Sequence, residues 1–295
     1  MTGGGAPART LLHEAARGLL SKHLAEDLDE ARLQVELLYA RAAGRDRAQV
    51  IAAGSETPPP ATLARFEQLL ERRLGAEPLP YILGEREFYG LRFEVGPGVL
   101  IPRPETETLV EATLAALREH PRAGRPVRVV DVGTGCGAVA LAVAHRAPAA
   151  TVLATENSAE ALEWAARNSE RLGLSDRVAL LPGELLAPAP GPLDVVAANL
   201  PYIPASEYES LPKAIREHEP RAAVDGGEDG LMIIRALLHQ LPDRLAEDAA
   251  AVLLEVGAGQ ASTVAELLTD AVGGRSLMHR DLLGTRRVVE ARIGY

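Results

Sequence analysis

Apolar residues recur every three or four positions through the first quarter of the chain, as they do on the buried face of an amphipathic helix. Gly44 and the run Thr57-Pro58-Pro59-Pro60 interrupt this pattern, because glycine commonly ends helices and proline commonly starts them. The pattern predicts helices over residues 10–20, 29–43, 45–53 and 59–74. Residues 1–80 are therefore expected to form a small N-terminal all-α bundle.

The segment after this bundle differs, because glycine, proline and aromatic residues are frequent in it. Residues 91–95 alternate apolar and polar positions between two glycines, which is typical of a short strand. We expect a β-hairpin linker over residues 81–104 that connects two domains. Its aromatic residues, Phe88, Tyr89 and Phe93, either pack the hairpin onto its neighbours or line the mouth of a binding site.

From residue 105 onward, short apolar runs alternate with stretches of helical periodicity. The predicted strands cover residues 127–132, 151–155, 178–181, 193–198, 251–256 and 286–292. The predicted helices cover residues 106–120, 137–147, 159–172, 231–245 and 260–268. Such alternation indicates an α/β domain, here residues 105–295, with a mainly parallel sheet and helices on both faces.

The composition excludes several classes of protein. Acidic residues outnumber basic residues 41 to 31, and the net charge of −10 argues against affinity that comes mainly from neutralising nucleic-acid phosphates. The chain has one cysteine and no ligand-spaced group among its seven histidines, so we expect no disulfide and no metal. No signal peptide or membrane-spanning apolar run is evident, so we expect a cytoplasmic protein. We also expect a monomer.

A glycine-rich turn directly follows the predicted strand 127–132. Its sequence is Asp131-Val132-Gly133-Thr134-Gly135-Cys136-Gly137, in which the glycines let backbone N–H groups approach a ligand closely. Ligands of open α/β sheets bind at the carboxyl ends of strands, near a reversal in strand order. Asp131 suits an ammonium group or its water, which favours S-adenosylmethionine (SAM), although a dinucleotide or a purely structural turn also fits.

Glu156 ends the next predicted strand. A carboxylate at that place can accept hydrogen bonds from both hydroxyls of an adenosine ribose. Because this holds for SAM and NAD alike, Glu156 indicates a nucleoside without choosing between them. We expect Cys136, inside the glycine turn, to be a small packing residue rather than a reactive thiol.

The loop Asn199-Leu200-Pro201-Tyr202 follows the predicted strand 193–198 and favours methyl transfer to a nitrogen. An amide or aromatic amine nitrogen is a poor nucleophile, because its lone pair is delocalised. The Asn199 side-chain oxygen and the Leu200 carbonyl oxygen can hold such an NH₂ group and stabilise the positive charge that grows on it.

The other two residues of this loop support that arrangement. Pro201 pushes Leu200 into the extended region and so aims its carbonyl, and Tyr202 offers a flat apolar face to a planar substrate group. No general base is required, since the proton can leave after methylation. The structural alternative is an ordinary strand-to-loop turn, because asparagine and proline are common turn formers.

With these motifs in place, the chain closely resembles the bacterial release-factor glutamine methyltransferases of the HemK/PrmC family. Besides the glycine turn, the resemblance is carried by Pro-Leu-Pro-Tyr-Ile-Leu-Gly-Glu (78–85), Val-Leu-Ile-Pro-Arg-Pro-Glu-Thr-Glu (99–107) and Glu-Pro-Arg-Ala-Ala-Val-Asp-Gly-Gly (219–227). It covers most of the chain. The segment at 99–107 is far more specific than the glycine turn.

The resemblance implies a seven-stranded, Rossmann-like SAM-dependent methyltransferase sheet whose last strands are antiparallel, and a helical bundle that helps dock a class 1 peptide chain release factor. It implies methylation of the glutamine side-chain nitrogen in the Gly-Gly-Gln motif of that factor, with S-adenosylhomocysteine as the other product and translation termination as the process. The cofactor-binding residues that it implies are Asp131, Gly133, Thr134, Gly135, Cys136, Gly137, Glu156, Leu185 (beside the adenine) and Asn199. The catalytic and substrate-binding residues that it implies are Asn199, Leu200, Pro201 and Tyr202, with Arg103 as a further substrate contact.

One position departs from the family pattern, which usually has proline where this chain has Leu200. The carbonyl survives the change, but a second locked φ angle is lost, so we expect a less rigid loop. Asn-Leu-Pro-Tyr is also typical of ribosomal RNA adenine dimethyltransferases, so an N6-adenine methyltransferase acting on DNA or RNA remains an alternative. The acidic net charge and the 99–107 segment weigh against it. A nucleotide-binding oxidoreductase or a non-catalytic binding module is the third alternative.

Overall fold

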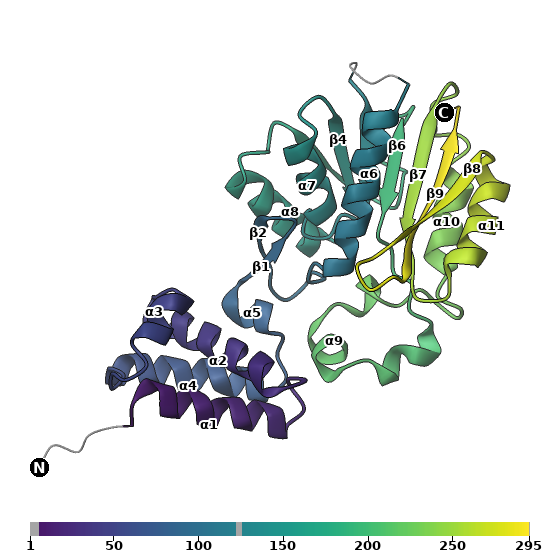
Figure 1. Ribbon diagram of the computed structural model, residues 1–295. Coiled ribbons are helices and arrows are strands. Elements are labelled where there is room, and N and C mark those ends of the chain that lie inside the picture. Colours follow the sequence, from purple (N-terminus) through teal and green to yellow (C-terminus); the bar gives the residue numbers. More distant parts are fainter. Residues whose placement is uncertain (1–5, 122–125, 295) are drawn as a thin grey trace, which may run out of the picture. The chain divides into compact units, whose positions relative to one another are not determined.

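The computed structural model describes residues 6–121 and 126–294 (Figure 1). Contacts within the chain divide it into two compact units, Met1–Glu85 with Pro212–His218, and Arg86–Leu211 with Glu219–Tyr295. We call them the helical unit and the sheet unit. The functional boundaries expected from the sequence, at residues 80 and 104, stay a prediction.

The helical unit contains the four helices that apolar periodicity predicts and two short ones that it does not. Its helices are α1 (Ala8–Ser21), α2 (Leu28–Ala43), α3 (Arg47–Ala52), α4 (Pro60–Leu74), α5 (Leu79–Leu83) and α9 (Lys213–His218). The apolar faces of α1 to α5 meet in one core, in which Leu19, Val35 and Leu38 are fully buried, whereas α9 has no buried residue. Gly44 ends α2 in the left-handed conformation, with φ 64°, as its place in the sequence predicts. Helix α5 is a single turn, too short to show periodicity.

A β-hairpin follows, as predicted. Strands β1 (Glu85–Phe88) and β2 (Leu91–Glu94) pair across the two residues Tyr89 and Gly90, whose φ angles of 53° and 76° are those of a tight hairpin turn. Phe88 and Phe93 are buried edge to face, with ring centroids 6.0 Å apart. Two of the three aromatic residues of this segment therefore pack the hairpin.

The described residues of the sheet unit form a seven-stranded sheet in the order β5-β4-β3-β6-β7-β9-β8. Its strands are β3 (Arg128–Val132), β4 (Thr151–Glu156), β5 (Val178–Pro182), β6 (Val195–Ala198), β7 (Ala250–Glu255), β8 (Arg275–Arg280) and β9 (Arg286–Ile293). The first five are parallel, whereas β9 runs antiparallel to both β7 and β8. The predicted fold class, with antiparallel last strands, is confirmed.

Helices cover both faces of this sheet. They are α6 (Glu107–Glu119), α7 (Ala138–Arg146), α8 (Ala159–Arg171), α10 (Met232–Gln240) and α11 (Ala261–Val272), with 3-10 turns at η1 (Pro104–Thr106), η2 (Ala205–Ser210) and η3 (Arg221–Ala223). Helices α6 and α7 pack together on one face, and α10 and α11 pack together on the other (Figure 1). Because the central strands are covered on both sides, they carry consecutive apolar residues instead of a regular alternation of apolar and polar ones.

Two predictions about elements are wrong. The helix expected over 231–245 ends at Gln240, because Pro242 lacks the N–H group that would continue the hydrogen bonds of the helix. Strand β8 was not expected, since its sequence Arg-Ser-Leu-Met-His-Arg has few strand-forming residues, and pairing with β9 holds it in place. Among the described residues, none of the helices is long and apolar enough to cross a membrane.

Candidate active site

The candidate site lies where the strand order reverses. From β3 the chain moves outward through β4 to β5, then returns to the other side of β3 with β6. Val132 at the end of β3 is in register with Thr155 of β4 and Ala198 of β6. The glycine turn, Glu156 and Asn199 therefore leave three neighbouring strands at the same edge, where ligands of open α/β sheets bind.

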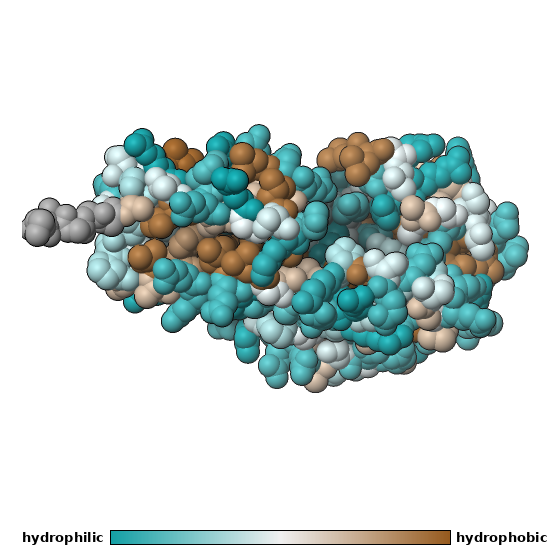
Figure 2. All heavy atoms as spheres, turned by 90° about the horizontal axis from the view of Figure 1, so that it is seen from below, coloured by the Kyte–Doolittle hydropathy of each residue, from teal (hydrophilic) through white to brown (hydrophobic). Residues whose placement is uncertain are grey.

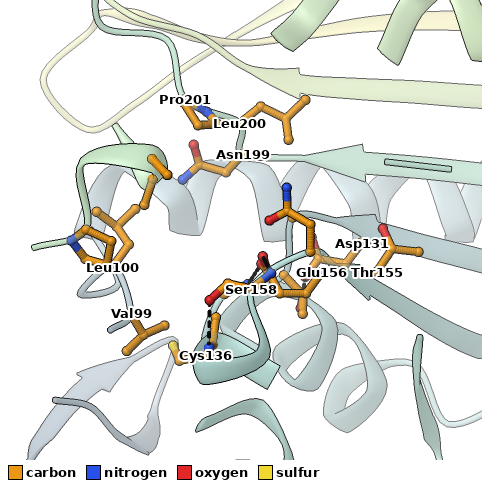
Figure 3. Close-up of a pocket in the computed structure, with 18 of the residues that line it drawn as sticks. Val99, Leu100, Asp131, Cys136, Thr155, Glu156, Ser158, Asn199, Leu200 and Pro201 are labelled. Carbon is orange, nitrogen blue, oxygen red and sulfur yellow. Dashed lines mark hydrogen bonds between the residues drawn. The ribbon is translucent and has the colours of Figure 1, made fainter. Parts of the chain in front are cut away.

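A cavity of about 220 Å³ occupies this edge, and all the residues that line it belong to the sheet unit. Of the predicted site residues, its lining contains Arg103, Asp131, Gly133, Thr134, Gly135, Cys136, Glu156, Leu185, Asn199, Leu200 and Pro201. Asn199, Leu200 and Pro201 lie on one side of it, and Glu156, Ser158 and Cys136 on the other (Figure 3). Among the described residues, Gly137 and Tyr202 are predicted site residues outside the lining.

The glycine turn needs its glycines for two different reasons. Gly133 has φ 70°, and a side chain there would meet Leu200 Cδ2 at 3.0 Å, so this glycine makes room for the loop after β6. Gly137 has φ 86° and precedes α7, where a side chain would meet Leu141 Cδ1 at 2.8 Å. Gly137 therefore shapes the start of the helix rather than the wall of the cavity.

Asp131 holds the glycine turn together. Its Oδ2 accepts hydrogen bonds from the Thr134 hydroxyl at 2.6 Å and from the Ala140 N–H at 3.0 Å. Complete burial raises the pKa of Asp131 to about 6, although these two hydrogen bonds favour the charged form. Asp131 lines the cavity, so its second oxygen can meet a ligand there.

Cys136 behaves as a buried packing residue. Burial raises the pKa of its thiol to about 12, so the sulfur stays protonated near neutral pH. Its carbonyl oxygen accepts a hydrogen bond from Asn168 Nδ2 at 3.0 Å, which ties the turn to α8. These contacts fit the packing role expected for it.

Glu156, at the end of β4, is held by backbone donors. Its Oε2 accepts from the Gly135 N–H and its Oε1 from the Ser158 N–H, each at 2.9 Å. Each carboxylate oxygen has two lone pairs, so each can still accept one hydrogen bond from a ligand. Leu185, from the loop after β5, also lines the cavity, and its φ of 49° is a strained conformation of the kind found at functional sites.

Asn199 lines the cavity, and its amide nitrogen is occupied. Asn199 Nδ2 donates to Thr106 Oγ1 at 3.0 Å, which orients the amide. Within residues 6–121 and 126–294, no donor reaches Asn199 Oδ1 or the carbonyl oxygen of Leu200. Two neighbouring residues of the lining thus each keep an open acceptor.

The rest of the loop after β6 is anchored in the sheet unit. The Leu200 side chain is buried in the core below the sheet edge, where it contacts Gly133. The carbonyl oxygen of Tyr202 accepts from Gln260 Nε2 at 2.9 Å. Burial, followed by the charge of Glu255, raises the pKa of the Tyr202 phenol to about 12. These contacts restrain the loop although leucine stands at position 200.

Glu255 is a buried carboxylate behind this loop that sequence reasoning missed. Burial raises its pKa to about 7, whereas Thr106, Arg287 and Tyr202 favour its charged form and Glu105 disfavours it. The Tyr202 hydroxyl reaches Glu255 Oε1 at 3.4 Å. Thr106 also accepts a hydrogen bond from the Asn199 amide, so Thr106 links Glu255 to the proposed catalytic side chain.

The 99–107 segment forms part of the cavity wall because Glu219 holds it. The buried Glu219 carboxylate accepts from the Ile101 N–H at 3.0 Å and pairs with the Arg103 guanidinium. Two of the segments that carried the family resemblance, 99–107 and 219–227, therefore meet at the site. Sequence reasoning also missed several residues of the lining, namely Gly98, Val99, Asn157, Ser158, Gly183, Glu184, Pro220 and Ala223.

Comparisons with known proteins show the family of this chain. The family model described as "PrmC N-terminal domain" matches residues 12–84, and the one described as "Methyltransferase small domain" matches residues 111–252. A protein named "Release factor glutamine methyltransferase" from Bradyrhizobium diazoefficiens is 40% identical over 285 residues, or 95% of this chain and 94% of that protein. The chain belongs to the release factor glutamine methyltransferase family.

A second relative of the same name, from Geobacter sulfurreducens, is 40% identical over 279 residues, which covers 94% of each protein. The crystal structure of a methyltransferase from Pyrococcus furiosus shares the fold, with a TM-score of 0.51, 22% identity, and coverage of 70% of this chain and 91% of that one. Family membership confirms the resemblance and the predicted class of enzyme, a SAM-dependent N-methyltransferase. It favours this class over the oxidoreductase and nucleic-acid alternatives.

Proposed function

We propose that this enzyme methylates the side-chain nitrogen of glutamine in the Gly-Gly-Gln motif of class 1 peptide chain release factors. The observation that carries the proposal is the pair of open acceptors, Asn199 Oδ1 and the Leu200 carbonyl oxygen, beside the glycine turn. A primary amide offers two N–H donors to such a pair. The relatives named above support the same substrate.

The residues opposite these acceptors fit SAM. Glu156 keeps one lone pair on each oxygen for the ribose hydroxyls, and Asp131 has an oxygen left for the amino group or its water. Leu185 offers an apolar surface for the adenine. When bound, SAM supplies an electrophilic methyl group on a sulfonium, and S-adenosylhomocysteine remains after transfer. Among the described residues, no group of three or more His, Cys, Asp and Glu is arranged to hold a metal.

The loop after β6 lowers the barrier by holding the nitrogen. Two directed acceptors favour a pyramidal NH₂ group whose lone pair is available, and they stabilise the positive charge that develops as the N–C bond forms. Because Thr106 holds Asn199 Nδ2, the acceptor is oriented before the substrate arrives. The proton leaves the nitrogen after methylation, so none of the side chains in this account acts as a general base.

The remaining roles follow from this function. We propose that the helical bundle helps to dock the release factor, that Arg103 and Tyr202 contact the substrate segment, and that Thr134 and Gly135 shape the cofactor pocket. We further propose that the enzyme acts as a monomer in the cytoplasm, during translation termination.

The direct test is mass spectrometry of a purified release factor after incubation with the enzyme and SAM. We expect one added methyl group on the glutamine of Gly-Gly-Gln. A release factor whose Gly-Gly-Gln is changed to Gly-Gly-Ala is the matched control and should gain no methyl group. Methyl incorporation into DNA or RNA, with none into the release factor, would contradict the proposal.

A further inference from the structure

The turn that joins β8 and β9 exposes two large apolar side chains to solvent. Leu282 is 103% exposed and Leu283 is 86% exposed, which are the highest exposures among the large apolar residues described. Single exposed apolar residues are ordinary, but an adjacent, fully exposed pair is not. In Figure 2, which views the molecule from below, apolar side chains stand out among polar ones over this turn.

The turn is rigid in spite of its exposure. Asp281 Oδ1 accepts from the N–H groups of Leu283 at 3.0 Å and Thr285 at 2.9 Å. The Asp281 side chain is only 3% exposed and pairs with Arg287 Nε at 3.2 Å. A surface held in its binding conformation loses little entropy when a partner covers it. The hydrogen bonds of Asp281 therefore hold the two leucines in a fixed, exposed position.

The same contacts tie the turn to the active site. Arg287 Nη1 donates to the carbonyl oxygen of Val256 at 3.0 Å, directly after β7. Arg287 also favours the charged form of Glu255, the carboxylate behind the catalytic loop. Since β9 is antiparallel to β7, its first residues lie at the carboxyl edge of the sheet (Figure 1). The leucine pair thus belongs to the edge that carries the site.

We propose that Leu282 and Leu283 form a docking surface for the protein substrate, and that they enter an apolar depression on the folded release factor outside its Gly-Gly-Gln segment. This inference rests on the proposed function. Two leucines bury far less than the roughly 800 Å² per partner of a stable interface, so they suit a contact that supplements the active site better than a dimer. A free glutamine or a short peptide cannot reach both places, so the surface selects a folded substrate.

The test compares two substrates with the double variant Leu282→Ser/Leu283→Ser. We expect kcat/KM for the intact release factor to fall about tenfold, because part of the transfer free energy of two leucines is lost. We expect kcat/KM for a short Gly-Gly-Gln peptide, the SAM affinity and the thermal midpoint to stay unchanged. Met278→Ser, on β8 of the same hairpin and 37% exposed, is the matched control and should leave all four unchanged.

Three outcomes would overturn the docking role. An unchanged kcat/KM for the release factor would show that the leucines contribute nothing. An equal loss on both substrates would assign the effect to the active site rather than to docking. A wild-type dimer that the double variant dissociates in sedimentation equilibrium would assign the leucines to a second copy of the chain. Where the peptide turns over too slowly, the dissociation constant of the release factor replaces kcat/KM. A wild-type enzyme that methylates neither substrate refutes the proposed function itself.

Discussion

Replacing Asn199 with alanine removes one of the two acceptors that the site offers to the substrate nitrogen. The lost interaction is a hydrogen bond to a group that becomes positively charged only in the transition state. Removal of one such preorganised contact typically costs about 3 kcal/mol, which corresponds to roughly a hundredfold decrease in kcat. The Leu200 carbonyl oxygen remains, so we expect a slow enzyme rather than a dead one.

Thr106→Val separates the chemical role of Asn199 from its orientation. Valine keeps the shape of the buried threonine but cannot accept the hydrogen bond from Asn199 Nδ2. Loss of a single hydrogen bond of this kind costs about 1 kcal/mol, so we expect kcat to fall roughly fivefold, far less than in Asn199→Ala. A small loss of kcat in Thr106→Val beside a large loss in Asn199→Ala would show that Thr106 orients the Asn199 amide. Similar losses in both variants would indicate a general effect of substitution in this region.

The assay for both variants is single-turnover methylation of a release factor, followed by mass spectrometry. SAM affinity is measured by calorimetry, and we expect it to change less than twofold in both, because Asn199 acts on the nucleophile. Two results would contradict this reasoning: Asn199→Ala with kcat within threefold of wild type, or a loss of SAM affinity as large as the loss of kcat.

The other predictions concern charge and backbone geometry. Burial raises the pKa of Glu255 from 4.5 to about 7, so ionisation of this carboxyl group destabilises the folded state. The free energy of unfolding of the wild type is therefore highest below pH 4.5 and declines as the pH rises to about 7. Glu255→Gln should therefore gain stability over wild type between pH 5 and 8, approaching roughly 3 kcal/mol; a difference independent of pH in urea unfolding would contradict this. Glu156→Gln places an NH₂ group against a backbone N–H donor and should weaken SAM binding about tenfold in calorimetry; unchanged affinity would exclude the ribose role. Gly137→Ala should lower the thermal midpoint more than Gly173→Ala, because both have positive φ but only Gly137 lacks space for a side chain. Equal decreases would show that crowding by Leu141 is unimportant.

The sequence by itself determined the order of elements in both parts of the chain. Apolar periodicity located α1 to α4, and the apolar runs located the buried strands β3, β4, β6 and β7, because a strand covered on both faces carries apolar residues at consecutive positions. The motifs also located Glu156 and Asn199 at strand ends. Local patterns sufficed there because they record burial and backbone conformation, which act over a few residues.

Only the tertiary structure decided what those residues face. Glu255 is an ordinary residue at the end of a strand until Thr106, Arg287 and Tyr202 surround it, and these come from three distant segments. Likewise, Gly137 belongs to the glycine motif, yet it supports the start of α7 instead of lining the cavity. Strand β8 forms through pairing with β9, and the leucine pair in the turn between them reaches the active-site edge only because β9 runs antiparallel to β7. Such roles depend on contacts between remote parts of the chain, which no local pattern of polar and apolar residues encodes.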